Sequence, residues 1–308
     1  MIGKQESVPD GSQAPPLYFV MRYFILDVFT KQALKGNPLA VVLDADNLSS
    51  DTMLALAREF NLSETTFVLK PTTPEAARRV RIFTPALELP LAGHPVIGTW
   101  YLLAAEKMVT TTEGWNTFHQ EVLAGILPVE ILVERGTVTQ VRMTQAKPQY
   151  FEEIPPVPIA QALGISTSDL DSSLSPQFVS TGMKQLMVPV RSREVLRQVE
   201  PAFSDLERLL GAHDSHLAYV FAQETAVYHA RSYFAAGSFA VEDPATGSAA
   251  GALGAYMYKQ RGVTALQISQ GIEMGRGATI QVEIAPAGDV VKVGGTAVIV
   301  ARGEITVA

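Results

Sequence analysis

Residues 88–105, ELPLAGHPVIGTWYLLAA, and residues 242–258, EDPATGSAAGALGAYMY, decide the fold of this 308-residue chain. Each segment begins with the pattern E-x-P-x-x-G and continues as an apolar stretch. Beyond the opening acidic residues, His94 is the only acidic or basic side chain in either segment. Each also follows an Arg-aromatic strand, RIF at 81–83 and RSYF at 231–234. A helix that is apolar on all sides is normally buried, so the repeat predicts two similar halves, each with a buried central helix.

Strand-forming sequence punctuated by glycine surrounds both predicted helices. LPVEILVERGTVTQVRMTQ (127–145) follows the first, and TIQVEIA (279–285) and VVKVGGTAVIVARGEITVA (290–308) follow the second. The expected fold class is α+β, with two pseudo-symmetric domains, each a mostly antiparallel sheet curled around a central buried helix. We expect an extension at residues 1–20, a first domain at 21–128 that is completed by about 297–308, and a second domain at 129–296.

Three shorter elements can also be predicted. Residues 23–45 favour a hairpin of two strands around a Gly36-Asn37-Pro38 turn. Ser49 or Ser50 can cap a helix that runs to Phe60, and a strand follows at 65–69. An amphipathic helix is expected from Glu194 to Leu210, with solvated arginines on its polar face.

Composition restricts the classes of function. The chain has 47% hydrophobic and 18% charged residues, which is enough apolar material for substantial cores. Its formal net charge of −7 argues against a nucleic-acid-binding protein, because such proteins concentrate Lys and Arg on a phosphate-facing surface. The chain contains no cysteine, which excludes disulfides, thiolate metal sites and thiol nucleophiles. A small molecule is the expected partner.

The N-terminal residues predict no export signal. Residues 1–20 mix charged side chains with prolines and lack the apolar core of a secretory signal, and Met21 is an alternative start to Met1. No stretch of the chain reaches the ~18–20 continuous apolar residues of a membrane span. We therefore expect a cytoplasmic protein.

The starts of the two predicted central helices are candidate anion-binding positions. Pro95 suits a first helical turn, which places His94 near the N-cap with its ring exposed. Asp243 precedes Pro244, and Thr246-Gly247-Ser248 then opens the second helix. Unpaired N–H groups at two facing helix starts would bind a carboxylate. Taken alone, either motif is more typical of an ordinary helix cap or tight turn, and it is the repeat together with the lone histidine that favours a binding site.

Several segments in fixed order resemble the phenazine biosynthesis-like (PhzF-like) family from about residue 23 to the end of the chain. They are DVFT with GNPLAVV, NLSETTFV, RIFTPALELPLAGHPVIGT, STGMKQLMVPV, RSYFAAGSFAVEDPATGSAAGALGAYM and QGIEMGRGATIQVEI. The resemblance implies a diaminopimelate-epimerase-like fold with the site in the cleft between two similar domains. It also implies an isomerase that moves a proton on a small carboxylated substrate, as in the isomerisation of dihydro-hydroxyanthranilate.

The same resemblance implies roles for individual residues. Glu64, which lies between a helix and a strand where a carboxylate is usually exposed, matches the family's acid/base. His94 and Asp243 match the GHP and DPxTGSA motifs and complete the implied catalytic set. The implied substrate-binding positions are Gly93, Thr246, Gly247 and Ser248. In the epimerase relatives paired cysteines stand where this chain has His94 and Ser248. Family members are expected to need no metal or other cofactor and to form homodimers.

Other motifs favour no second activity. His213-Asp214-Ser215-His216 has an H-x-x-H spacing but no third strong ligand nearby, and Gly275-Arg276-Gly277 is too short for a dinucleotide fingerprint. Two alternatives to the isomerase stay open on sequence alone. One is the same fold with a different proton transfer, by an epimerase, racemase or tautomerase. The other is a catalytically silent protein that binds a small molecule.

Overall fold

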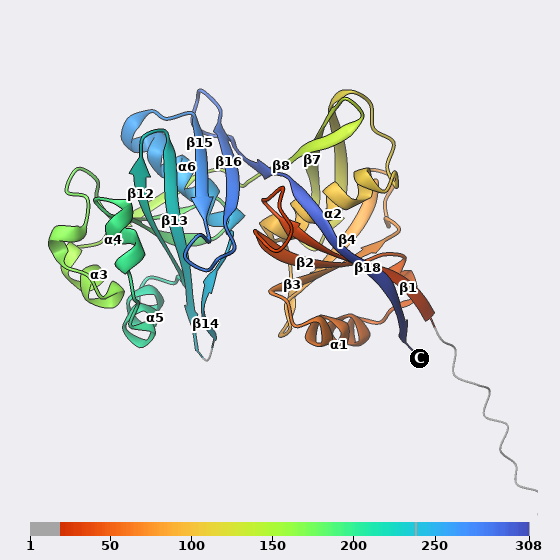
Figure 1. Cartoon of the computed structure of the whole chain (residues 1–308), viewed down its shortest axis with the longest axis horizontal. Coiled ribbons are helices and arrows are strands. Elements are labelled where there is room, and N and C mark those ends of the chain that lie inside the picture. Colours follow the sequence, from red (N-terminus) through yellow and green to blue (C-terminus); the bar gives the residue numbers. More distant parts are fainter. Residues whose placement is uncertain (1–18, 238, 308) are drawn as a thin grey trace, which may run out of the picture.

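The computed structural model describes residues 19–237 and 239–307. They form two lobes, each a sheet curled around one central helix, α2 (Gly93–Ala105) in one and α6 (Gly247–Arg261) in the other (Figure 1). The α+β fold with two sheet-wrapped helices that the sequence predicts is therefore confirmed.

The first lobe contains α2, and the second lobe contains α6. The elements of the first lobe are β1 (Phe19–Val28), β2 (Asn37–Val42), η1 (Ala45–Asn47), α1 (Ser50–Phe60), β3 (Glu64–Leu69), β4 (Arg78–Phe83), β5 (Glu88–Leu89), α2, β6 (Gly114–Val122), β7 (Gly125–Glu134), β8 (Thr137–Thr144) and β18 (Ala297–Val307). The elements of the second lobe are β9 (Gln149–Glu153), α3 (Pro156–Leu163), η2 (Thr167–Asp169), β10 (Gln177–Ser180), β11 (Lys184–Pro189), α4 (Arg193–Gln198), α5 (Phe203–Gly211), β12 (Leu217–Glu224), β13 (Val227–Ala236), β14 (Phe239–Asp243), α6, β15 (Ala265–Gln270), β16 (Ala278–Ile284) and β17 (Val291–Gly295).

Strand pairing repeats between the lobes. In the first lobe β2 pairs in parallel with β3 and β4 with β6, and in the second lobe β11 pairs in parallel with β12 and β13 with β15. The other ladders are antiparallel, including the short β5 on β4 and β14 on β13. This identical order of parallel and antiparallel pairs confirms the pseudo-symmetric halves inferred from the repeat.

Two ladders connect the halves. β8 pairs with β17 across the lobes, and β18 returns from the second lobe to pair with β1 of the first (Figure 1). Strand pairing groups β7, which spans residue 128, with β6 and β8. The exact domain boundaries expected from the sequence stay a prediction.

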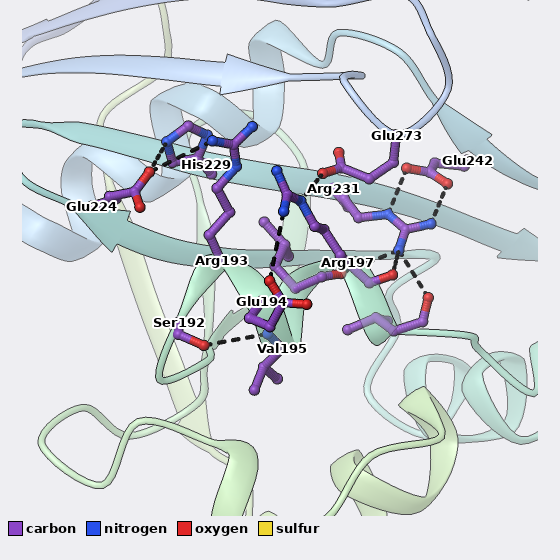
Figure 2. Close-up of polar contacts among 12 residues, drawn as sticks. Ser192, Arg193, Glu194, Val195, Arg197, Glu224, His229, Arg231, Glu242 and Glu273 are labelled. Carbon is purple, nitrogen blue, oxygen red and sulfur yellow. Dashed lines mark hydrogen bonds and ion pairs between the residues drawn. The ribbon is translucent and has the colours of Figure 1, made fainter.

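An arginine–glutamate pair holds the short strand that leads into each central helix. Arg81 donates from Nε and Nη2 to both carboxylate oxygens of Glu88, at 2.7 and 2.6 Å. Arg231 binds Glu242 in the same way at 2.9 and 2.8 Å, and it also donates to backbone carbonyls at the end of α4 (Figure 2). Each guanidinium also lies over the aromatic ring two residues further along its strand, at 5.0 and 5.1 Å. The repeated Arg and Glu residues therefore fix where α2 and α6 begin.

Three apolar clusters make up the core. The largest is continuous between the lobes and surrounds α2 and α6. A second lies between the sheet of the second lobe and α3, α4 and α5, and a third lies under α1. In the described part of the chain, no helix combines the length and the apolar character needed to cross a membrane.

Two expectations about local structure need correction. The stretch 194–210 is not one helix: α4 ends at Gln198 and α5 begins at Phe203, because Pro201 lies between them and cannot continue a helix. The hairpin of β1 and β2 is present, but its turn occupies 29–36, and Asn37 is already the first residue of β2. Ser49 is the N-cap of α1, which ends at Phe60 as expected.

The Arg81–Glu88 and Arg231–Glu242 pairs, called the Arg–Glu clamps below, give a stability prediction. Arg231→Met should lower the free energy of unfolding by roughly 2–4 kcal/mol, because it leaves the largely buried Glu242 without its partner. Arg208→Met should change it by less than about 0.5 kcal/mol, since the Arg208 side chain is 78% exposed. Urea unfolding of both variants measures the difference. Equal stabilities would contradict the structural role of the clamp.

Candidate functional site

Glu64 and His94 meet where the two lobes approach each other. Glu64 is the first residue of β3, reached from α1 through the left-handed Asn61, and His94 is the second residue of α2. Glu64 Oε2 lies 3.3 Å from His94 Nε2, and the two side chains are only 17% and 7% exposed. The expectation of an exposed His94 ring is wrong, because the start of α2 abuts the start of α6 rather than solvent.

The two facing atoms lack an ordinary hydrogen-bond partner. Within the described residues, neither Glu64 Oε2 nor His94 Nε2 has a hydrogen-bond partner, although both atoms are buried. Buried polar atoms are nearly always hydrogen-bonded in folded proteins, and exceptions occur preferentially at functional sites. The Glu64–His94 pair is therefore a candidate functional site.

Burial changes the protonation of this pair. Loss of solvent, together with the negative charge of Asp243, raises the pKa of Glu64 to about 8. Burial also lowers the pKa of His94 to about 3. At neutral pH the contact is therefore mainly a protonated carboxyl beside a neutral imidazole rather than an ion pair. A carboxyl that titrates near neutrality can both accept and return a proton.

Glycine allows the two helix starts to touch. A Cβ atom built on Gly93 would lie 3.4 Å from the Cα of Gly247 and 3.5 Å from the backbone nitrogen of Ser248. The Ser248 hydroxyl makes no hydrogen bond with the described residues and is half-buried. The first backbone N–H groups of both helices, with the positive ends of their dipoles, are thus concentrated in one small region.

Asp243 ends β14 and lies in a hydrogen-bonded network. The hydroxyl of Thr246 donates to its Oδ2, and the amide of Asn37 donates to its Oδ1 at 2.9 Å. Gln270 donates to Thr246 Oγ1 at 3.0 Å and accepts from Tyr219 at 2.9 Å. Burial raises the pKa of Asp243, while the bonds from Thr246 and Asn37 oppose that rise.

The structure thus brings together most of the residues singled out in the sequence. Glu64, His94, Gly93 and Gly247 are in mutual proximity, and Asp243 is close enough to act on Glu64 electrostatically. The Thr246 hydroxyl is already engaged by Asp243 and Gln270, so its role in substrate binding stays a prediction. Sequence reasoning missed Asn37, Gln270 and Tyr219. Of these three, only Asn37 lies in a motif that the sequence analysis named, the Gly36-Asn37-Pro38 turn, and that motif was interpreted as a turn and not as part of the site.

Two other places offer no comparable chemistry. His213 Nδ1 is 2.7 Å from Glu152 Oε1 and its ring lies against Phe178, so the H-x-x-H residue is held by a surface contact. Residues 19–237 and 239–307 contain no group of three His, Asp or Glu side chains suited to a metal ion. A cavity of about 510 Å³ opens at the far end of α2, and none of the candidate site residues lines it.

Comparison with known proteins adds a family and relatives. Residues 26–303 match the family model described as "Phenazine biosynthesis-like protein". A relative in Pseudomonas aeruginosa, named trans-2,3-dihydro-3-hydroxyanthranilate isomerase, is 34% identical over 289 residues, which cover 92% of this chain and 98% of the relative.

Solved structures agree with the fold. A Bacillus anthracis protein of the phenazine biosynthesis PhzF family superposes with a TM-score of 0.81 at 30% identity, covering 93% of this chain and 99% of its own. A hydroxyproline epimerase from Agrobacterium vitis shares the fold with a TM-score of 0.62 at 12% identity, covering 94% and 93% of the two chains.

The protonation of Glu64 predicts a pH dependence of stability. Its folded pKa is raised from 4.5 to about 8, so its contribution to stability is fully present below pH 4.5 and is lost as the pH rises through 8. The glutamine side chain in Glu64→Gln is neutral at every pH, so the variant does not lose this stability as the pH rises. Thermal midpoints of the wild type and the variant, measured from pH 4.5 to 9, should diverge in favour of the variant by roughly 5 °C or more. Parallel curves would show that Glu64 has an ordinary pKa.

Proposed function

Because this chain belongs to the phenazine biosynthesis-like protein family and is an isomerase, we propose that it moves a proton within a small carboxylic acid, with Glu64 as both base and acid. The observation that carries this proposal is the unpaired Glu64–His94 contact. Two buried polar atoms, 3.3 Å apart and without a hydrogen-bond partner in the described residues, face each other where the lobes meet.

The proposed reaction balances within the substrate. Ionised Glu64 removes a proton from one carbon, and the electron pair of that C–H bond moves into the adjacent conjugated system. The protonated Glu64 then returns the proton to another carbon of that system, which regenerates the carboxylate. A pKa near 8 supports both steps at neutral pH, because neither protonation state is costly to reach.

Electrostatic stabilisation has to supply much of the remaining acceleration. A positioned acid/base typically contributes about 10²–10⁴-fold, so Glu64 alone is insufficient. Negative charge develops on the substrate as the proton leaves carbon, and the starts of α2 and α6 offer backbone N–H groups to an anion. In the proposal, these groups at Gly93, Gly247 and Ser248 hold the substrate's carboxylate, and the neutral His94 orients a polar substituent.

The substrate class follows from the relatives and the site together. The Pseudomonas aeruginosa relative is named for trans-2,3-dihydro-3-hydroxyanthranilate, a conjugated ring acid. We propose a substrate of this class: a carboxylic acid with a removable proton next to a conjugated system. The residue pattern supports the class of reaction more strongly than the identity of the ring.

Hydrogen–deuterium exchange tests the role of Glu64. In D₂O, the wild-type protein with dihydro-hydroxyanthranilate should incorporate deuterium at carbon or form product, because the Glu64 proton exchanges with solvent. Glu64→Gln should lose at least about 10³-fold in rate, since an amide cannot accept the proton. Glu59→Gln, which alters an exposed residue of α1, is the matched control. Unchanged turnover in Glu64→Gln would exclude the assignment.

A substrate panel separates the alternatives. Glu64-dependent exchange at the α-carbon of an amino acid or hydroxy acid, without the ring acid reacting, would indicate an epimerase or racemase instead. Ligand-induced thermal stabilisation without any exchange would indicate a binding protein.

Gly93→Ala tests the helix-start anion site. The added methyl group would lie 3.4 Å from the Gly247 Cα, an ordinary contact, and 3.5 Å from the Ser248 nitrogen, where it would obstruct that N–H group. We expect KM to rise roughly 10-fold or more while the thermal midpoint changes by only a few degrees, as a charge-assisted hydrogen bond is lost. An unchanged KM would mean that the carboxylate binds elsewhere.

A further inference from the structure

Asn37 of the first lobe binds directly to Asp243 of the second lobe. Its Nδ2 lies 2.9 Å from Asp243 Oδ1 and also 2.9 Å from the backbone carbonyl oxygen of Ala245. The Asn37 side chain is fully buried. One amide group therefore holds both the carboxylate and the backbone just before α6.

The orientation of this amide is determined by its partners. A carboxylate and a carbonyl oxygen are both acceptors, so only the NH₂ group of Asn37 can face them. Asn37 follows Gly36, whose φ of 63° is left-handed and whose added Cβ would lie 2.1 Å from the carbonyl oxygen of Val28. The Gly36 N–H donates to the backbone carbonyl oxygen of Arg276, in the second lobe, at 3.1 Å. The backbone conformation at Gly36 thus fixes the position of Asn37 at the boundary between the lobes.

The hydrogen bond from Asn37 matters because Asp243 is surrounded by groups that disfavour its charge. Burial and the negative charge of Glu242 both favour the protonated form of Asp243. Glu64 interacts with it unfavourably when both are ionised, and Tyr219 and His94 nearby are neutral at pH 7 because burial disfavours their charged forms. Among the described residues, the donors that stabilise the carboxylate are those on Asn37 and Thr246.

We propose that Asn37 is a positioning residue for the isomerisation: across the lobe boundary, its amide orients the Asp243 carboxylate and favours its ionised form. This inference rests on the proposed function, in which Glu64 carries the proton, and on the electrostatic effect of Asp243, whose negative charge raises the pKa of Glu64. Loss of the bond would allow Asp243 to rotate and become protonated, and Glu64 would then lose the neighbouring charge that helps to keep its proton affinity high. Residues of both lobes, Asn37 of the first and Asp243 of the second, would then act on the protonation of Glu64.

The test compares two Asn37 variants with a matched control. Asn37→Ala removes the donor. Asn37→Asp keeps the size of the side chain but replaces the donor with a second carboxyl group. Lys35→Met is the control, because Lys35 is only half-buried and its Nζ makes a different, solvent-exposed bond between the lobes, to the carbonyl oxygen of Gly275 at 2.8 Å.

The first readout needs no substrate. The carboxyl carbons of ¹³C-aspartate-labelled, ligand-free protein are titrated by NMR, and Asp243→Asn identifies the Asp243 signal. Asn37→Ala should raise the Asp243 midpoint by about one pH unit or more, the effect expected for losing a hydrogen bond to a charged group. Asn37→Asp should raise it as well, because two adjacent carboxyls cannot both ionise easily. Lys35→Met should leave it unchanged.

The second readout is the pH profile of isomerisation with dihydro-hydroxyanthranilate. In Asn37→Ala the acidic limb, which reports ionisation of the base Glu64, should move to lower pH, because a protonated Asp243 no longer raises the pKa of Glu64. In both Asn37 variants kcat should fall roughly 10- to 100-fold, with a smaller change in KM. Lys35→Met should keep the wild-type profile.

The outcomes distinguish this inference from the proposed function. An unchanged Asp243 midpoint in folded Asn37→Ala or Asn37→Asp overturns the inference, whatever the activity. A shifted midpoint with an unshifted pH profile in an active enzyme also overturns it, because Asp243 would then not control the reaction. A shifted midpoint in a protein that shows no Glu64-dependent exchange supports the Asn37–Asp243 coupling and refutes the proposed function instead.

Discussion

The structure depends on the close contact between the N-terminal ends of α2 and α6. Two glycines, Gly93 and Gly247, lie at this contact, and a Cβ atom on Gly93 would lie 3.5 Å from the backbone nitrogen of Ser248. Each helix is buried over most of its length because its sequence there is apolar on all sides, which keeps its start away from solvent. The two Arg–Glu clamps then fix the strands that lead into these starts.

In the proposed function, desolvation at this contact makes Glu64 suited to proton transfer. Glu64 in solvent would be a carboxylate with a pKa near 4.5, too weak a base to remove a proton from carbon at a useful rate. Burial raises that pKa to about 8, which makes the ionised form a stronger base and still leaves it accessible near neutrality. The same burial keeps His94 neutral, so it can hydrogen-bond a substrate without adding a charge that would return Glu64 to its ordinary acidity.

The fold was more predictable from sequence than the site. Apolar helices and a six-residue repeat are local patterns, and they correctly predicted the two halves. The break at Pro201 was missed because the apolar periodicity continues on both sides of it. The burial of His94 was missed because it depends on the opposing lobe. Asn37 is 206 residues from Asp243, and no local spacing could relate a turn residue to a carboxylate at that separation.

The pseudo-symmetry is also consistent with the proposed mechanism, in which one carboxylate is both base and acid. The clamp arginines are equivalent, so Thr65, paired with Phe83, corresponds to Ala218, paired with Tyr233. The residue preceding each is Glu64 in the first lobe and Leu217 in the second, so only one of the two equivalent positions can carry a proton. Inversion at a carbon by two bases requires groups on both sides of the substrate. A single base beside one helix start is instead suited to returning the proton to the face from which it was taken, at a different carbon.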